Sequence, residues 1–245
     1  MPHYKGYIFD LDGTLYRGAE AIPHAVDVVR ELERGGAQIA YLTNNSSMRN
    51  SRLAEKLRAM GFPTRDEQVV GTAWGVTQYL PAGSKCYVVG SPDLMWSLSQ
   101  RHEIVDVGAD HVVVGICREL SYRHLDMALQ NLLAGAKFVA TNTDVTYPKE
   151  GGQVQPGAGA MIGALTGMVK RPPDVIVGKP EPYLVHLILE QFGLPASDVL
   201  MVGDRYETDI LAGEKAGCPA HMVLTGVATR APEGVSCSLD LQGLL

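Results

Sequence analysis

The chain is predicted to be an α/β protein built on parallel sheets. Two observations carry this prediction: short apolar runs alternate with helical patterns along the 245 residues, and clusters of polar residues follow several of these runs directly. Alternating strands and helices are typical of parallel sheets with crossover helices. The length allows one or two domains with a large core, and 46% hydrophobic and 20% charged residues is ordinary for a globular protein.

The first part of the chain supplies a helix with a clear apolar face. This helix is predicted over 25–34, where Val26, Val29 and Leu32 share one side. Gly35 follows and ends it. The other elements predicted in this part are strands at 7–10, 38–43 and 68–71 and a helix from about 49 to 60.

The middle and the last part continue the same alternation. A helix is predicted to begin after Ser121, which is a suitable N-cap residue. Its apolar stripe is predicted to be Leu125, Leu129, Leu132 and Leu133. Trp74 and Trp96 fall in apolar helical stretches and are predicted to lie in the core. The other predicted elements are strands at 85–89, 111–115, 137–141, 175–178, 199–202 and 220–224, and helices at 158–167, 183–192 and 208–216.

The position of the polar clusters predicts how the chain is divided. Those with catalytic character lie at 10–14, 43–45, 179 and 204–209, and the middle of the chain contains none of them. We therefore expect a discontinuous core domain, residues 1–78 and 178–245, interrupted by an inserted α/β unit at 79–177.

Charge and cysteine usage restrict the partners and the compartment. The formal net charge is -6 and the chain has no run of Lys or Arg, so no nucleic-acid partner is expected. No apolar stretch is long enough to span a bilayer, so no membrane association is expected, and the N-terminus does not resemble a signal peptide. Four scattered cysteines, without a C-x-x-C pair, indicate reduced thiols and a cytoplasmic protein.

Two carboxylates one residue apart form the most informative feature of the sequence. Asp10 and Asp12 stand at the end of the apolar run 7–9, before Gly13. A pair of acids in one small polar spot requires a cation, a shared proton or solvent, and a divalent ion with oxygen ligands is the obvious partner. Taken alone, the pattern slightly favours a simple turn.

Later segments complement this pair. Thr43, Asn44 and Asn45 follow the strand predicted at 38–43 and suit an anionic ligand, although an Asn-rich turn is the simpler interpretation of these residues alone. Lys179 is fixed by the proline after it and can neutralise a phosphoryl oxygen or a carboxylate.

A third carboxylate is predicted at the same edge of the sheet. The strand at 199–202 delivers Asp204 to its carboxyl end, and Asp209 follows at a predicted helix start. There Asp209 could serve only the helix dipole. Asp204 is harder to explain without a ligand, because it would join Asp10 and Asp12.

In this order the motifs are DLDGT at 10–14, TNN at 43–45, GKP at 178–180 and GDRYETDI at 203–210. The set resembles the haloacid dehalogenase superfamily, and the long insert after the second motif is similar to subfamily IIA, phosphatases with a large α/β cap. That group includes nitrophenyl, nucleotide and pyridoxal phosphate phosphatases. The resemblance covers essentially the whole chain, including residues 140–144, 156–159 and 224–227.

The resemblance implies a Rossmann-like core with a C2-type cap and a role for each motif residue. Asp10 would be the nucleophile that forms an aspartyl-phosphate, and Asp12 the general acid and base. Mg²⁺ would bind the Asp10 and Asp204 carboxylates and the Asp12 backbone carbonyl, with Asp209 acting through water or a second layer of contacts. The remaining implied roles are phosphoryl binding by Thr43, Asn44 and Asn45, and charge compensation by Lys179.

The function expected from this resemblance is Mg²⁺-dependent hydrolysis of small phosphate monoesters. A phosphotransferase using the same intermediate and a non-catalytic metabolite-binding protein are the alternatives. The cap loop at 142–152 is expected to select the substrate. In this loop Tyr147 stands where similar pyridoxal phosphatases carry His, and it either stacks on a substrate ring or only packs. A homodimer through the exposed sheet edge of the cap is a further expectation.

Overall fold

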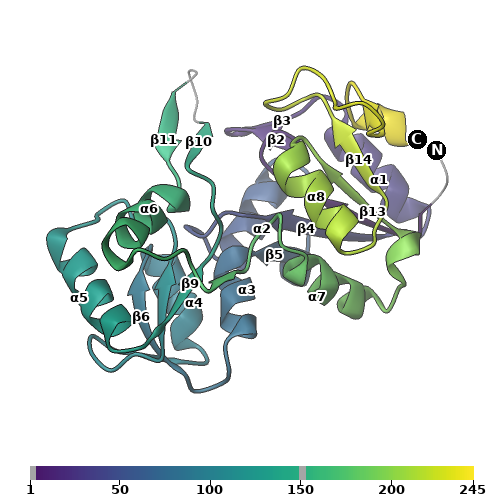
Figure 1. Cartoon of the computed structure of the whole chain (residues 1–245). Coiled ribbons are helices and arrows are strands. Elements are labelled where there is room, and N and C mark those ends of the chain that lie inside the picture. The colour runs from purple at the N-terminus through teal and green to yellow at the C-terminus, as the bar shows by residue number, and fades with distance from the viewer. Residues whose placement is uncertain (1–3, 149–152) are drawn as a thin grey trace. The chain divides into compact units, whose positions relative to one another are not determined.

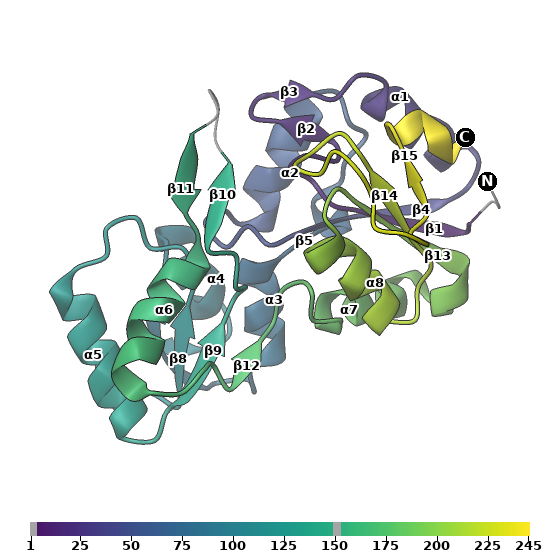
Figure 2. The same ribbon diagram turned by 45° about the horizontal axis from the view of Figure 1, so that its top comes forward.

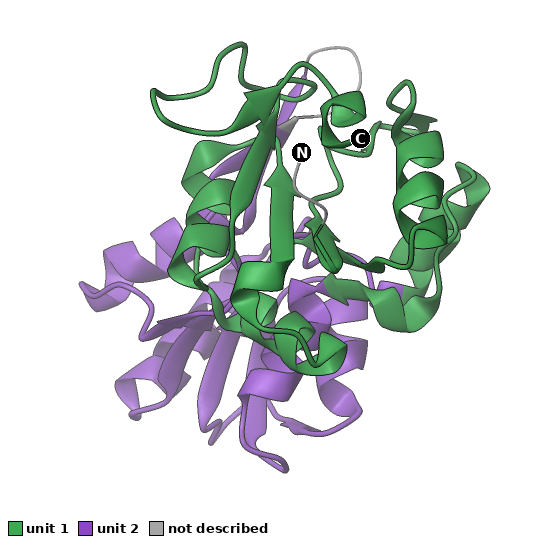
Figure 3. Ribbon diagram, turned by 90° about the vertical axis from the view of Figure 1, so that its right-hand side faces the viewer, with its two compact units in different colours: residues 1–43, 51–70, 179–245 green, residues 44–50, 71–178 purple. Residues whose placement is uncertain are grey.

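The computed structural model describes residues 4–148 and 153–245. The chain forms two compact units, shown in two colours in Figure 3. Unit 1 comprises residues 1–43, 51–70 and 179–245, and unit 2 comprises residues 44–50 and 71–178. The contacts therefore group residues 44–50 and 71–78 with unit 2. The predicted domains, a core at 1–78 with 178–245 and an insert at 79–177, stay a prediction.

Unit 1 is built on a six-stranded sheet with the order β15-β14-β13-β1-β4-β5 (Figure 1). The central strand β1 (Gly6–Phe9) is parallel to β4 (Gln38–Thr43) on one side and to β13 (Val199–Gly203) on the other. The carboxyl ends of these three strands therefore meet at one edge of the sheet. The outer strands are β5 (Val69–Gly71), β14 (Ala220–Val223) and β15 (Cys237–Ser238).

Helices cover both faces of this sheet, with α1 and α2 on one face and α7 and α8 on the other (Figure 2). Right-handed crossovers lead to this arrangement, because the chain moves outward from β1 in both directions. Helix α1 buries Val28, Val29 and Leu32, and Val26 is partly buried. The helices are α1 (Ala25–Arg34), α2 (Asn50–Ala59), α7 (Tyr183–Phe192) and α8 (Leu211–Lys215).

Several short elements of unit 1 have no counterpart in the sequence prediction. An antiparallel hairpin of β2 (Tyr16–Arg17) and β3 (Glu20–Ala21) follows the first motif. The predicted helix over 208–216 begins earlier, as a π-helix, η4 (Tyr206–Ile210), which continues into α8. The 3₁₀ turns are η1 (Asp66–Gln68), η3 (Ala196–Asp198) and η5 (Leu241–Leu244).

Unit 2 contains a five-stranded parallel sheet with the order β12-β9-β8-β6-β7. Its strands are β6 (Lys85–Val89), β7 (Glu103–Ile104), β8 (His111–Val114), β9 (Lys137–Ala140) and β12 (Val175–Ile176). Its helices are α3 (Thr72–Tyr79), α4 (Pro92–Ser99), α5 (Tyr122–Leu133) and α6 (Ala158–Val169), and the hairpin β10 (Thr146–Pro148) with β11 (Val154–Pro156) precedes α6.

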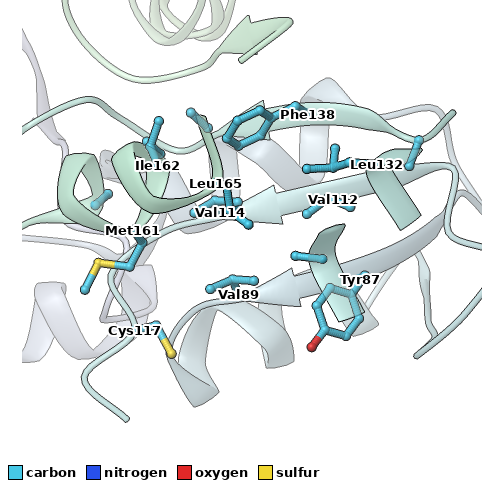
Figure 4. Close-up of a cluster of buried hydrophobic side chains, with 14 of the residues drawn as sticks. Tyr87, Val89, Val112, Val114, Cys117, Leu132, Phe138, Met161, Ile162 and Leu165 are labelled. Atoms are coloured by element: carbon cyan, nitrogen blue, oxygen red, sulfur yellow. The ribbon is translucent and has the colours of Figure 1, made fainter. Parts of the chain in front are cut away.

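One hydrophobic core layer of unit 2 lies between its sheet and helices α5 and α6 (Figure 4). Ser121 caps α5 as predicted, because its hydroxyl accepts from the backbone N–H of His124. The predicted burial of Leu133 is wrong: it is 69% exposed, one residue beyond the buried Leu132. The core side chains labelled in Figure 4 are Tyr87, Val89, Val112, Val114, Cys117, Leu132, Phe138, Met161, Ile162 and Leu165.

Trp96 of α4 is 47% exposed, so the prediction that it lies in the core is wrong. Its ring is covered by the guanidinium of Arg49, 4.4 Å from the ring centroid, and Arg49 also contacts Asp93 at 3.6 Å. A cation–π contact of this kind stabilises a tryptophan ring that is partly exposed to solvent. Among the described residues, no helix has the length and apolar character needed to cross a bilayer.

Candidate active site

Three neighbouring strands of unit 1 deliver polar side chains to one edge of the sheet. Asp10 follows β1, Thr43 is the last residue of β4, and Asp204 follows β13. The Asp10 N–H donates to the Val202 carbonyl at 2.8 Å, so the parallel ladder continues to the aspartate itself. Thr43 is buried at this edge. The carboxyl edge of a parallel sheet is where ligands bind in open α/β proteins.

Four charged side chains gather there. The carboxylate oxygens of Asp10, Asp204 and Asp209 all lie within 4.8 Å of one another, and all three residues are buried. Lys179 Nζ lies 2.5 Å from Asp10 Oδ1 and 2.7 Å from Asp209 Oδ1. It also donates to the Leu42 carbonyl oxygen at 3.3 Å. Three carboxylates against one ammonium leave an excess of negative charge when all are ionised.

Burial and mutual repulsion disfavour this excess charge. Burial raises the pKa of Asp10 well above its usual value; Lys179 opposes the shift, while Asp209 and Asp204 add to it. Burial raises the pKa of Asp204 to about 6, and Asp209 contributes in the same direction. Burial alone would lower the pKa of Lys179, but the Asp10 and Asp209 carboxylates outweigh burial and raise it. Lys179 therefore stays an ammonium ion.

Asp209 is fixed by its own segment as well as by Lys179. Its Oδ2 accepts from the Arg205 N–H at 3.0 Å, and the Thr208 hydroxyl donates to its Oδ1 at 3.2 Å. A Cβ on Gly203 would overlap the Asp209 side chain, so the GD pair of the fourth motif needs its glycine for space. These contacts give Asp209 more than the helix-dipole role that the sequence left open.

This carboxylate group fits a hard divalent cation. Clustered carboxylate oxygens are the ligands that Mg²⁺ and Ca²⁺ prefer, and a cation there would offset the charge that burial disfavours. Among the described residues the group consists of Asp10, Asp204 and Asp209. The side chain of Asp12 lies outside it, which leaves its backbone carbonyl as its predicted contribution.

A loop near the C-terminus encloses Asp204. The Val227 N–H donates to Asp204 Oδ2 at 3.0 Å, and a Cβ on Gly226 would overlap the same carboxyl group. The Thr225 hydroxyl donates to the Gly13 carbonyl at 2.7 Å and ties this loop to the first motif. In the sequence, residues 224–227 were part of the family resemblance but were assigned no role.

Replacing Gly226 with alanine is expected to weaken Mg²⁺ binding roughly 10- to 100-fold, the usual cost of disturbing a residue behind a metal ligand. The added methyl group would displace the Asp204 carboxyl group. Isothermal titration of the folded protein with MgCl₂ measures this effect without an assay of activity. Gly163→Ala is the matched control, because its added Cβ meets open space. Equal Mg²⁺ affinities for both variants would contradict the role of the loop.

Asp12 stands beside this group with contacts of its own. The hydroxyl of Tyr16 donates to Asp12 Oδ2 at 3.1 Å. Lys56 Nζ lies over the Tyr16 ring, 3.8 Å from its centroid. Surrounding protein raises the pKa of Asp12 by desolvation, while Lys56 and the hydrogen bond from Tyr16 oppose the shift. Sequence reasoning missed both Tyr16 and Lys56.

The other predicted site residues belong to unit 2. Asn44 donates from its amide nitrogen to Asp144 Oδ2 at 2.9 Å, and Asn45 Oδ1 accepts from the Ser47 N–H at 2.8 Å. Tyr147 packs against the core of unit 2. Its hydroxyl accepts from Arg118 at 3.1 Å and donates to Gln155 at 2.6 Å. Residues 149–152 of the loop predicted at 142–152 lie outside the described residues.

Comparison with known proteins gives consistent matches. Family models for haloacid dehalogenase-like hydrolases match residues 7–102 and 176–237. A 5'-nucleotidase of Bacillus subtilis is 37% identical over 94% of this chain and 91% of that protein. The solved p-nitrophenyl phosphatase from Archaeoglobus fulgidus superposes with a TM-score of 0.92 at 32% identity, covering 99% of this chain and 98% of that one.

A glycerol phosphate phosphatase from Mycobacterium tuberculosis, solved in complex with magnesium, superposes with a TM-score of 0.89 at 30% identity. The match covers 99% of this chain and 76% of that one. The four motifs, the parallel-sheet fold and these relatives all indicate the same family. The chain belongs to the haloacid dehalogenase-like hydrolases, in the subfamily IIA phosphatases.

Proposed function

We propose that this protein hydrolyses phosphate monoesters of small molecules with Mg²⁺ and through an aspartyl-phosphate on Asp10. The observation that carries the proposal is the group of three buried carboxylates, of which Asp10 and Asp209 pair with Lys179, with Asp12 beside it. A buried ammonium ion reduces the repulsion that Asp10 would exert on a phosphate dianion.

The carboxylates of Asp10 and Asp204 and the backbone carbonyl of Asp12 would hold the ion, with Asp209 behind them. When bound, Mg²⁺ supplies positive charge that stabilises phosphoryl oxygens. The ammonium group of Lys179 contributes a second, permanent positive charge next to the Asp10 carboxylate. Thr43, at the end of β4, together with Asn44 and Asn45 after it, is proposed to bind phosphoryl oxygens.

The proposed reaction has two steps. In the first, an Asp10 carboxylate oxygen attacks phosphorus, the bond from phosphorus to the ester oxygen breaks, and Asp12 gives its proton to that leaving oxygen. In the second, the Asp12 carboxylate takes a proton from water, and the water oxygen attacks phosphorus. The bond to Asp10 then breaks, inorganic phosphate leaves, and Asp12 is again protonated for the next cycle.

The proposed substrates are small metabolite esters. The relatives are named for a nucleotide, for p-nitrophenyl phosphate and for glycerol phosphate, so they support a class of ester more than a single compound. Tyr147 is proposed to take part in substrate selection. A homodimer and a cytoplasmic location stay predictions from the sequence.

Phosphate release from a panel of nucleotide, sugar, glycerol and p-nitrophenyl phosphates tests the proposed function. We expect release with Mg²⁺, loss of release with a chelator, and recovery when Mg²⁺ is returned. Transfer of the phosphoryl group to added alcohols in preference to water would favour a phosphotransferase. Ester binding without turnover by the folded, Mg²⁺-loaded protein would favour a metabolite-binding role.

Replacing Asp12 with asparagine is expected to slow hydrolysis most for esters with a poor leaving group. General acid catalysis contributes about 10²- to 10⁴-fold, and an alkoxide needs the proton more than p-nitrophenolate does. The measurement is kcat/KM on glycerol phosphate and on p-nitrophenyl phosphate. Equal losses on the two esters would contradict the general-acid role of Asp12.

A further inference from the structure

Tyr16 is placed to control which oxygen of Asp12 reacts. Its ring is 1% exposed, and its hydroxyl reaches Asp12 Oδ2 at 3.1 Å. Asp12 itself has access to solvent. A buried donor thus meets one oxygen of a carboxyl group whose surroundings are otherwise partly open. A hydrogen bond from a fixed donor of this kind restricts the rotamer of the carboxyl group.

The backbone around Tyr16 holds the ring in place. The Gly13 N–H donates to the Tyr16 carbonyl at 2.8 Å, and the Tyr16 N–H donates to the Leu11 carbonyl at 3.3 Å. These two bonds close the turn that carries Asp12, and Tyr16 then pairs with Ala21 in the β2–β3 hairpin. The donor and its acceptor therefore belong to one short, internally bonded segment.

Helix α2 supports the ring from another direction. The ammonium group of Lys56 lies 3.8 Å from the centroid of the Tyr16 ring, within the range of a cation–π interaction. This contact uses the ring face, whereas the hydrogen bond to Asp12 uses the hydroxyl. Loss of the hydroxyl alone therefore leaves the packing of the ring intact.

We infer that Tyr16 is a positioning residue for the general acid: its hydroxyl occupies Asp12 Oδ2, so that the transferable proton is carried on Oδ1. Burial raises the pKa of the Tyr16 hydroxyl, and the neighbouring Asp12 and Asp10 charges add to the shift, so Tyr16 keeps its proton and remains a donor. Tyr16 gives no proton to the substrate. It fixes Asp12 in one orientation through both halves of the cycle.

This inference rests on the proposed function of Asp12, and Tyr16→Phe tests it. The phenylalanine ring keeps its contact with Lys56 and loses only the donor. We expect kcat/KM on glycerol phosphate to fall roughly 10- to 100-fold, and on p-nitrophenyl phosphate by less than about threefold. KM should change little, because the hydroxyl does not contact the substrate. The double variant with Asp12→Asn should lose no more than Asp12→Asn alone.

Tyr7→Phe is the matched control, because Tyr7 is another buried tyrosine of unit 1 whose hydroxyl contacts only the Tyr4 backbone N–H among the hydrogen bonds of the described residues. Both esters should be hydrolysed normally by this variant. If Tyr16→Phe does not fold, 4-aminophenylalanine at position 16 restores a donor at the same place and should retain activity on glycerol phosphate.

Two results would overturn the inference about Tyr16: an equal loss on both esters, which indicates a structural role only, or no loss on either. A leaving-group effect in Asp12→Asn that is absent in Tyr16→Phe would reject the role of Tyr16 and keep the proposed function. No hydrolysis by the unmodified protein with Mg²⁺ would reject the proposed function, and the role of Tyr16 with it.

Discussion

Asp10→Asn is expected to reduce turnover by roughly four orders of magnitude or more, because an amide cannot replace the carboxylate as the attacking group. The loss should be the same for good and poor leaving groups, since every ester needs the nucleophile. Initial rates with saturating Mg²⁺, for glycerol phosphate and p-nitrophenyl phosphate, measure it.

The fold should tolerate this change. The raised pKa of Asp10 means that burial disfavours its charge, and asparagine removes that charge while keeping the size of the side chain. We therefore expect a melting temperature within a few degrees of the unmodified protein. Asp198→Asn is the control, because Asp198 forms a surface ion pair with Lys5 and should leave the rates unchanged. Near-normal hydrolysis by Asp10→Asn would reject Asp10 as the nucleophile.

Lys179→Met is expected to have the largest effect on stability, a loss of about 3–5 kcal/mol in the free energy of unfolding without metal. Lys179 is 2% exposed, and its removal leaves the buried carboxylates of Asp10 and Asp209 without their cation. Added Mg²⁺ should restore part of the loss, because an ion bound to the same carboxylates stabilises the folded state. Urea unfolding with and without Mg²⁺ measures both the loss of stability and its partial recovery.

Lys215→Met is the matched control for Lys179→Met. Lys215 lies 2.8 Å from Glu181, a distance like those in the buried group, but both side chains are about 40% exposed. Its removal should cost less than about 1 kcal/mol. The two variants should differ because of burial, not because of the distance between the charges, and equal losses would contradict this account.

The effect of Lys179→Met should also depend on pH. Lys179 holds down the raised pKa of Asp10, so without the ammonium group this pKa rises further above its value in the unfolded chain, and the folded state binds more protons than the unfolded state. Stability then falls as pH rises from the pKa of the unfolded chain to the higher pKa of the folded chain. We expect a smaller loss at pH 5 than at pH 8, and the opposite order would contradict the role of Lys179 as the compensating charge.

Much of the fold was predictable because its signals are local. The strands at 38–43 and 85–89 and the helices at 25–34 and 183–192 have the predicted bounds, since each is a periodic apolar segment with clear ends. The β2–β3 hairpin was missed because each of its strands has two residues, too few to show a period. Leu133 shows the limit of reading apolar residues as buried ones, because its position on α5 faces solvent.

The site shows the same division between local and distant signals. Asp10, Lys179, Asp204 and Asp209 were predicted from strand ends and motif order, and the structure brings them together. Tyr16 carried no signal of its own, because its role depends on a hydrogen bond to a side chain four residues earlier. Gly226 likewise becomes meaningful only when folding places it on Asp204.

The reaction is proposed to pass through a phosphorylated Asp10. Asp12→Asn with p-nitrophenyl phosphate and Mg²⁺ should reveal this species, because the good leaving group needs no acid while hydrolysis of the intermediate has lost its base. Rapid acid quenching and peptide mass spectrometry are expected to find one phosphoryl group on Asp10, together with a burst of p-nitrophenol. Steady release of phosphate without any phosphorylated Asp10, in this variant and in the unmodified protein, would contradict the account.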